Sequence, residues 1–396
     1  MKYCVAAGLI FLAVVVLLFV AADHIHQDSG AVVAVDDGRG DFSDSLEVGG
    51  VRPDAGGGGD DDGSFEGRPL YFVQIDAQDV VNKGADAVIA DLVAGGVNTV
   101  VLQVFSDDDE VGVYWNSKIA PVREDILSEF VSLSHDNGLS VFVWMTTLDM
   151  PWVYDESPDM RMKAYVDGRM SEDTGWYRRI SPTVVQHREY IADVFREIAM
   201  NYDIDGILLQ DDLYWGSDEV FDDFTREAYL DDTGRELTAD VVDDPSFHEW
   251  KAGWLTAIVR AINDEVKAVR PDVRLAVNVY AECALSLDWC LPDFGQDYRA
   301  LAINSDYMAI MAYHVMAGEE PSWVGDVTRS ALSLETESKE TIIKAQVVDW
   351  DKDADIDAGE VKGALVSAKR AGAKNIGFYI SGRTMSEMGI DFRELG

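Results

Sequence analysis

Eight short apolar segments, separated by stretches of helical periodicity, constrain the fold of this chain more than any other feature. They cover residues 70–75, 97–105, 139–145, 207–209, 275–279, 307–312, 342–347 and 376–380. Each is rich in Val, Ile, Leu or Phe and bounded by turn residues, which is typical of strands buried on both faces. Alternation of such strands with helices indicates βα units. The sequence therefore predicts an α/β fold, a (β/α)₈ TIM barrel.

Between the strands, helices are expected over 80–94, 125–137, 182–201, 254–270 and 358–371. The two longest connections, residues 146–181 and 213–250, carry several aromatic side chains. Long loops that follow the strands of a barrel commonly shape its substrate cleft. We therefore expect these two segments to border a binding site.

The first 68 residues differ in composition from the rest. An apolar run from Cys4 to Ala22 is long enough for a membrane-spanning helix. We expect residues 1–22 to be an uncleaved anchor that leaves the barrel outside the cell; a cleaved signal peptide of a secreted protein is the alternative. Residues 23–68 are rich in Asp, Gly and Ser and predict a disordered linker. Residues 69–396 remain for the barrel.

The chain is strongly acidic, with 73 acidic and 32 basic residues and a net charge of −41. Because 47% of its residues are hydrophobic, this is not the composition of a disordered chain. We interpret the excess of acidic residues as belonging to a solvated surface that is adapted to high salt, where screening weakens the repulsion between like charges. The absence of a basic stripe argues against nucleic-acid binding. A cationic or amine-bearing ligand would be attracted.

One strand ends in two adjacent carboxylates. Gln210, Asp211 and Asp212 follow the apolar run 207–209 directly. In (β/α)₈ barrels the catalytic residues come from the C-terminal ends of the strands. We therefore predict Asp211 and Asp212 as catalytic residues, with Asp218 in the following loop as a further candidate acid. Solvated surface positions are the alternative in so acidic a chain.

The other strand ends carry amides, carboxylates and aromatic rings. We predict substrate-binding roles for Asp76, Gln103, Phe105, Trp144, Gln210, Asn278, Tyr280, Tyr313, His314, Gln346, Trp350 and Tyr379. Such a set suits a carbohydrate, because polar groups bind hydroxyls and rings stack on the apolar sugar face. Cleavage of a glycosidic bond also requires a proton-donating carboxylic acid. Packing or hydrogen bonding is the alternative for Tyr313, His314 and Trp350.

No cofactor or metal is expected. The chain lacks a Gly-rich phosphate loop, a Gly-x-Ser-x-Gly elbow and a Cys/His zinc cluster. Aspartates alternate over 351–357, but Ile356 and Lys362 stand where a calcium loop requires Gly and Glu. Cys283 and Cys290 form either one local disulfide or two separate buried thiols.

Several segments are collinear with a known family. They include Asp205-Gly206-Ile207-Leu208-Leu209-Gln210-Asp211-Asp212 and residues 97–105, 179–182, 306–311, 346–350 and 372–379. Over nearly all of 69–396 the chain resembles the C-terminal glycoside-hydrolase-type domain of the PgaB family of poly-β-1,6-N-acetyl-D-glucosamine deacetylases. In that family the domain is a (β/α)₈ barrel that binds the polymer and, in some members, cleaves it when partly deacetylated.

The resemblance implies a sugar-binding groove around Asp211 and Asp212, with one of them or Asp218 as the general acid. Gln103, Trp350 and Tyr379 would line the groove, while Gln210 departs from the family by replacing a His. The metal-dependent deacetylase domain that precedes the barrel in the family is missing from this sequence, so deacetylation is not expected.

The sequence therefore predicts a cell-surface glycoside hydrolase acting on a partly deacetylated β-1,6-linked N-acetylglucosamine-type exopolysaccharide. The alternative is a non-catalytic module for binding or export of such a polymer, because a barrel can retain its groove without its acid.

Overall fold

The computed structural model describes residues 68–106, 111–166, 169–172, 174–175, 177–334, 340–380 and 382–395. The expected anchor and almost all of the expected linker lie outside these ranges, so both stay predictions. Among the described helices, none combines the length and the apolar character needed to cross a bilayer.

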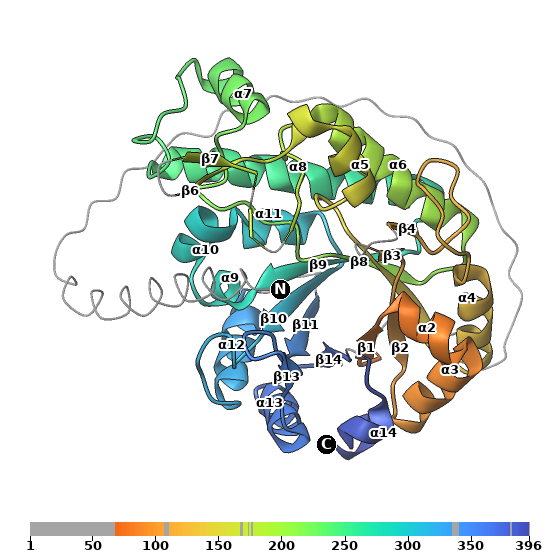
Figure 1. Ribbon diagram of the computed structural model, residues 1–396. Coiled ribbons are helices and arrows are strands. Elements are labelled where there is room, and N and C mark those ends of the chain that lie inside the picture. The colour runs from red at the N-terminus through yellow and green to blue at the C-terminus, as the bar shows by residue number, and fades with distance from the viewer. Residues whose placement is uncertain are drawn as a thin grey trace, which may run out of the picture. The chain divides into compact units, whose positions relative to one another are not determined.

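Eight parallel strands form a closed barrel, with helices around its outside (Figure 1). The strands are β1 (Tyr71–Ile75), β2 (Thr99–Gln103), β5 (Ser140–Met145), β8 (Gly206–Leu209), β9 (Arg274–Tyr280), β10 (Tyr307–Ala312), β11 (Glu340–Ala345) and β14 (Asn375–Tyr379). Each pairs with the next barrel strand in the sequence, and β14 closes onto β1 with Gln74 opposite Tyr379. The predicted (β/α)₈ barrel is confirmed.

Helices follow the strands and cover the barrel. The longer ones are α3 (Ala85–Ala94), α4 (Leu127–Asp136), α6 (Val185–Asn201), α7 (Asp223–Thr233), α8 (Pro245–Val269), α10 (Leu287–Phe294), α12 (Trp323–Ser333) and α13 (Ala358–Arg370). The shorter ones are α2 (Ala77–Lys83), α5 (Pro151–Glu156), η2 (Pro158–Met160), α9 (Ala281–Leu285), α11 (Tyr298–Ile303), α14 (Met385–Met388) and η3 (Phe392–Glu394). Helices α6 and α8 pack side by side (Figure 1).

Three two-stranded hairpins interrupt the βα connections. They are β3 (Phe105–Ser106) with β4 (Gly112–Val113), β6 (Ala164–Val166) with β7 (Arg169–Ser171), and β12 (Val348–Asp349) with β13 (Ala354–Asp355). The last one contains part of the aspartate series that resembles a calcium loop. In the described ranges, no three His, Cys, Asp or Glu side chains are grouped so that they could hold a metal.

Some helices differ from the expected ones. The helix expected over 80–94 is two helices, because Gly84 has a φ of 84° and breaks the helical path between α2 and α3. Helix α8 begins at Pro245, well before the expected residue 254, with the Asp244 side chain capping its first turn through the Ser246 amide. The segment 281–303, for which no helix was expected, forms α9, α10 and α11.

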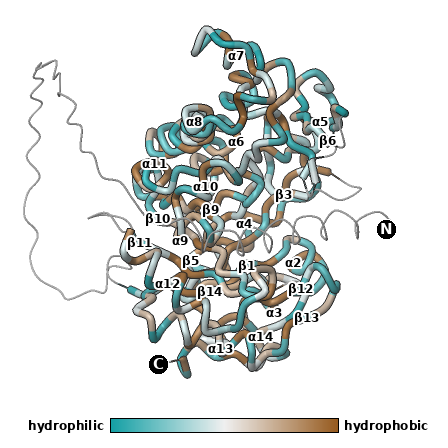
Figure 2. The backbone as a smooth tube through the Cα atoms, turned by 90° about the vertical axis from the view of Figure 1, so that its left-hand side faces the viewer, coloured by the Kyte–Doolittle hydropathy of each residue, from teal (hydrophilic) through white to brown (hydrophobic). Residues whose placement is uncertain are grey.

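The barrel interior changes from apolar to polar along its axis. Its N-terminal end is filled by apolar side chains, which leave a cavity of only about 10 Å³ between them. In Figure 2 the hydrophobic segments gather in the interior, whereas α7 on the outside is largely hydrophilic. Because side chains alternate along a strand, the next inward set lies two residues further on. We call this set the polar layer: Gln74, Gln103, Trp144, Gln210, Asn278, Met311 and Lys344.

Candidate active site

Asp211 lies at the C-terminal mouth of the barrel, just beyond β8, and its side chain is partly exposed. Tyr177 Oη donates a hydrogen bond to Asp211 Oδ1 at 3.0 Å, and Tyr280 Oη donates to the Asp211 carbonyl at 3.4 Å. Burial raises the pKa of Tyr177, Tyr280 and Tyr313 well above the ordinary value, and the charge of Asp211 raises each further. One carboxylate therefore lies among three neutral phenols.

Aromatic rings border the Asp211 carboxylate on the side of β8 and β9. The Tyr214 ring meets Tyr177 and Tyr280 edge-on, with centroids 6.4 and 5.7 Å away. Tyr280 is stacked on Phe294 of α10 at 4.0 Å. Edge-to-face and stacked contacts fix ring orientations, so these tyrosines form a preorganised wall.

A second aromatic wall comes from β5 and β14. Trp144 meets Tyr379 and Phe105 edge-on at 5.5 and 5.7 Å, and its Nε1 donates to Gln210 Oε1. Gln103 ends β2 directly opposite Trp144 in the sheet register. Phe105 itself is only 2% exposed and packs behind Trp144. Of this group, Phe105 supports the wall and does not face a ligand.

The mouth also contains a second carboxylate and a further pair of rings. Tyr379 Oη donates to both oxygens of Asp76, at 2.8 and 3.0 Å. Tyr313, just after β10, lies against Trp350 with centroids 5.3 Å apart. These four side chains are partly exposed, and they extend the aromatic and acidic character of the mouth across β1, β14 and β10.

Asp212 has a different environment from its neighbour. It is fully buried and accepts five hydrogen bonds from the loop after β5: from Thr146 Oγ1, from the amide and Oγ1 of Thr147, and from the amides of Leu148 and Asp149, at 2.6–2.9 Å. Burial raises the pKa of Asp212, and these hydrogen bonds oppose that effect. Its carboxylate holds this loop and does not reach a ligand.

Other expected site residues also lie outside the mouth. His314 is fully buried, with Nε2 3.1 Å from Glu360 Oε1 of α13. Gln346 is 1% exposed, and its Oε1 accepts the Val315 and Met316 amides at 3.0 and 3.1 Å. Both side chains stabilise the segment after β10, so neither is available to bind a substrate.

Asp218 and Asn278 are the remaining members of the predicted site. Asp218 is exposed, and its carbonyl accepts the Tyr165 amide of hairpin β6–β7 at 2.8 Å. Asn278 is 1% exposed within the polar layer, beneath the mouth. Among the predicted catalytic aspartates, Asp211 is the one whose carboxylate accepts a hydrogen bond from a residue of the aromatic walls.

Three side chains near the mouth had not been assigned individual roles from the sequence. Tyr177 comes from the long connection 146–181, where no periodicity indicates which side chain points inward. Lys344 lies in the apolar segment of β11, two residues before Gln346, and strand alternation alone would have identified it as inward-facing. Glu282 lies two residues beyond Tyr280, in the first turn of α9.

Glu282 is a partly exposed carboxyl group whose pKa is shifted by its surroundings. Burial raises the pKa of Glu282, and the nearby charge of Asp293 raises it further. Tyr280 experiences the charges of both Asp211 and Glu282. Both carboxyl groups are partly exposed, and both act electrostatically on the same phenol, but Asp211 also accepts the Tyr177 hydrogen bond.

Two buried basic side chains fix the loop that follows β8. Arg179 Nη1 donates to the Tyr214 carbonyl at 2.6 Å, its Nη2 pairs with Glu219, and its guanidinium lies 3.8 Å from the centre of the Tyr214 ring. Lys251 of α8 donates to the carbonyls of Trp215 and Pro292 at 2.8 and 3.0 Å. The wall formed by Tyr214 is thus held from below by charge-assisted hydrogen bonds.

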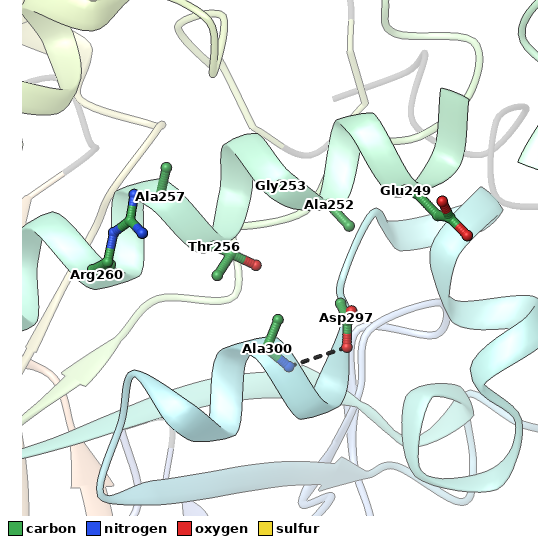
Figure 3. Close-up of a pocket in the computed structure, with 8 residues that line it drawn as sticks. All are labelled: Glu249, Ala252, Gly253, Thr256, Ala257, Arg260, Asp297 and Ala300. Carbon is green, nitrogen blue, oxygen red and sulfur yellow. Dashed lines mark hydrogen bonds between the residues drawn. The ribbon is translucent and has the colours of Figure 1, made fainter. Parts of the chain in front are cut away.

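A cleft of about 300 Å³ lies elsewhere, on the outer surface between α8 and α11 (Figure 3). Its walls carry Thr256, Ala257 and Arg260 of α8 and Ala300 of α11. Its acid Asp297 is engaged in capping α11, since it accepts the Ala300 amide at 3.1 Å. None of the mouth residues lines this cleft, so we place the chemistry at the mouth of the barrel.

Residues 70–379 match the pattern of a family described as hypothetical glycosyl hydrolase family 13. The chain belongs to this family. The resemblance to the glycoside-hydrolase-type domain of PgaB is likewise confirmed.

Two kinds of relatives support the family assignment. The poly-β-1,6-N-acetyl-D-glucosamine N-deacetylase of Escherichia coli K12 is 23% identical over 333 residues, which cover 78% of this chain and 48% of that protein. The chain thus spans about half the length of the curated relatives it matches. The PgaB (BpsB) glycoside hydrolase domain from Bordetella bronchiseptica has a TM-score of 0.68 at 21% identity, covering 79% of this chain and 95% of that one.

A β-galactosidase from the haloarchaeon Halorubrum lacusprofundi has the same fold, with a TM-score of 0.56 at 16% identity over 80% of this chain and 54% of that one. Likeness at this level shows the barrel and nothing finer. In hypothetical glycosyl hydrolase family 13, as in other barrels, the chemistry has to be argued from the side chains at the mouth.

Proposed function

We propose that this domain hydrolyses glycosidic bonds in a β-1,6-linked, partly deacetylated N-acetylglucosamine-type polysaccharide. The observation that carries the proposal is the Asp211 carboxylate, held by Tyr177 between aromatic walls at the mouth of a glycosyl hydrolase family barrel. The name of the Escherichia coli relative supports the polymer class. The net charge of −41 would attract the free amines of a deacetylated sugar.

Two carboxyl groups have complementary roles in this proposal. Asp211, which is partly exposed and accepts a hydrogen bond from Tyr177, acts as the charged carboxylate beside the scissile bond. Glu282, whose pKa burial raises, supplies the proton to the leaving oxygen. In this proposal Glu282 replaces the expected acid of the 211/212/218 group, because Asp212 is sealed by its five donors and Asp218 is exposed in the loop after β8.

Product analysis tests the activity. The full-length chain, in high salt, is incubated with β-1,6-glucosamine oligomers of graded acetylation, and shorter products are sought by mass spectrometry. We expect Asp211→Asn to abolish cleavage and Asp231→Asn, an exposed aspartate on α7, to leave it intact. Intact oligomers that nevertheless bind would show the alternative, a binding module. If the oligomers are neither cleaved nor bound, the proposed ligand is refuted.

A second substrate separates the two carboxyl roles. A nitrophenyl leaving group needs no proton, whereas a sugar leaving group does. Glu282→Gln should therefore lose cleavage of oligosaccharides while retaining much of its activity on a nitrophenyl glucosaminide, and Asp211→Asn should lose both. Equal losses of Glu282→Gln on the two substrates would remove Glu282 as the proton donor.

We also propose that the barrel acts outside the cell. The Cys283 and Cys290 side chains form a disulfide between α9 and α10, which resolves the two sequence-based alternatives in favour of the bond. Disulfides persist in oxidising compartments, in agreement with the expected anchor or signal segment. Protease accessibility of the barrel on intact cells tests this location.

A further inference from the structure

Lys344 is a buried cation beneath the candidate active site. It lies on β11, is 2% exposed, and is the only charged member of the polar layer. Its Nζ donates a hydrogen bond to Asn278 Oδ1 at 2.7 Å. Transfer of an ammonium group from water to a protein interior costs several kcal/mol unless partners compensate it. Burial of a lysine inside a barrel whose N-terminal half is apolar therefore costs free energy unless an opposite charge compensates it.

The contacts of Lys344 lead to the backbone that carries Asp211. Asn278 on β9 donates its Nδ2 to the Leu209 carbonyl at 2.8 Å. Leu209 ends β8, two residues before Asp211. The hydrogen bonds thus cross the interior from β11 to β9, which are separated by β10 in the barrel order, and continue to β8, which adjoins β9 (Figure 1).

The charge that acts on Lys344 is that of Asp211. Burial lowers the pKa of Lys344 to about 8, and the Asp211 carboxylate opposes this shift. The other titratable groups at the mouth on nearby strands are Tyr280, Tyr313, Tyr379 and Asp76. The phenols are neutral at pH 7, and Asp76 is bound by Tyr379 on the β1 side. Lys344 in the barrel interior and Asp211 at its mouth are therefore an electrostatically coupled pair.

We propose that Lys344 is a positioning residue for Asp211: an interior counter-ion that, through Asn278 and the Leu209 carbonyl, holds this carboxylate in place above the polar layer. The inference rests on the proposed function, in which Asp211 is the carboxylate beside the scissile bond. Lys344 itself is not catalytic, since it is enclosed and binds Asn278. Its effect reaches the substrate only through Asp211.

The first test is the pH profile of cleavage by the full-length chain. Lys344→Met retains the length and apolar stem of the side chain and removes the charge. We expect kcat/KM to fall about 10- to 100-fold, mostly in kcat, and the acidic limb of the profile to move up by about one pH unit. Lys251→Met removes another fully buried lysine, one that contacts the loop after β8. This control is expected to leave the position of the acidic limb unchanged.

The second test needs neither cleavage nor a variant in the barrel interior. In protein labelled with ¹³C at lysine Cε, the Lys344 signal is titrated in wild type and in Asp211→Asn. Because coupling between two charges is reciprocal, loss of the Asp211 charge should lower the pKa of Lys344 below its value of about 8. Asp211 is partly exposed, so this variant is expected to keep the fold, which circular dichroism verifies.

The outcomes separate this inference from the proposed function. If wild type cleaves no oligomer, the proposed function fails, and the titration alone decides whether the pair exists. An unchanged Lys344 titration in Asp211→Asn would overturn the inference. So would a folded Lys344→Met variant with the wild-type rate and pH profile. A displaced acidic limb together with a lowered Lys344 pKa would establish the pair.

Discussion

Asp211 and Asp212 are adjacent in the chain and have opposite environments. Asp211 accepts a hydrogen bond from one phenol and is open to the mouth, whereas Asp212 is saturated by five donors. Three of those donors are backbone amides of a single loop, so Asp212 stabilises the conformation of residues 147–149. One carboxylate is thus available for chemistry because the other secures the neighbouring loop.

Tyr177 is expected to assist Asp211 through its hydroxyl. In Tyr177→Phe the ring remains and the 3.0 Å hydrogen bond to Asp211 is lost. Hydrogen bonds to charged groups contribute about 1.5–3 kcal/mol, so we expect kcat for oligosaccharide cleavage to fall at least about tenfold. Tyr165→Phe is the matched control, because that tyrosine is exposed on hairpin β6–β7. Equal rates for both variants would show that the Tyr177 hydroxyl has no role.

Asp212 is expected to be important for stability. Asp212→Ala leaves three amides and the Thr147 hydroxyl without their acceptor, and a loss of about 3–5 kcal/mol in the free energy of unfolding is expected for breaking such a buried charged network. Asp212→Asn should cost less, because its amide oxygen can replace Oδ2, which accepts four of the donors. Urea unfolding measures both; an Ala variant as stable as Asn would contradict the argument.

The residues of the mouth that could be predicted from sequence are those at strand ends. Asp211, Trp144, Tyr280 and Tyr379 follow from strand alternation and from the common edge at which parallel strands end. The burial of Asp212 and Gln346 could not be predicted, because their donors come from loops whose path no periodicity specifies. Tyr177 could not be selected among the aromatic residues of its long connection for the same reason.

At the scale of elements, helix α8 supports the mouth from outside the barrel. Lys251 reaches from α8 to carbonyls of the loop after β8 and of α10, and it is fully buried. Burial lowers the pKa of Lys251 to about 7. The contact between α8 and this loop is therefore made partly by an amine that loses its proton near neutral pH.

Lys251 predicts a pH dependence of stability. Between about pH 7 and 10.5 the unfolded chain holds a proton on Lys251 that the folded chain has released. The free energy of unfolding attributable to this group therefore rises with pH in that window, by at most about 1.4 kcal/mol per pH unit. The gap in stability between wild type and Lys251→Met should grow in favour of wild type from pH 7 to pH 9.

Urea unfolding at several pH values measures this gap. Lys362→Met, a partly exposed lysine on α13, is the control and should show no comparable rise. A gap between wild type and Lys251→Met that stays constant, or shrinks as the pH rises, would mean that Lys251 is charged in the folded protein throughout.

The strands were predicted closely and the connections were not. A buried strand leaves a continuous apolar run with clear ends, so β10 lies where it was expected, over Tyr307–Ala312. Helices α9, α10 and α11 are each eight residues or fewer, and Pro292 lies inside α10. Such short helices carry too few turns for amphipathic periodicity to be recognised. They depend on packing and, in α9 and α10, on the Cys283–Cys290 disulfide.

At the scale of the whole molecule, the net charge of −41 dominates. The described ion pairs are mainly at the surface, such as Arg270 with Asp272 or Lys362 with Glu394, and exposed pairs contribute little each. Repulsion among the remaining carboxylates therefore opposes compaction. The interpretation of the sequence as adapted to high salt stays a prediction, and it has a measurable consequence.

We expect the melting temperature to rise with KCl concentration. Screening shortens the Debye length from about 10 Å at 0.1 M to about 3 Å at 1 M, so most of the rise should occur below about 1 M. Salts that act by exclusion from the protein surface would instead raise stability steadily beyond that concentration and differ between anions. Melting curves in KCl, NaCl and NaBr at equal ionic strength distinguish the two causes.

Three curves that coincide and level off would identify repulsion as the force that salt relieves. In that case the same screening should weaken attraction of a deacetylated, amine-bearing polymer. Stability and affinity for a cationic ligand would then change with salt in opposite directions. Affinity that is indifferent to salt would place recognition in the aromatic walls and the carboxyl groups of the mouth rather than in the charge of the whole surface.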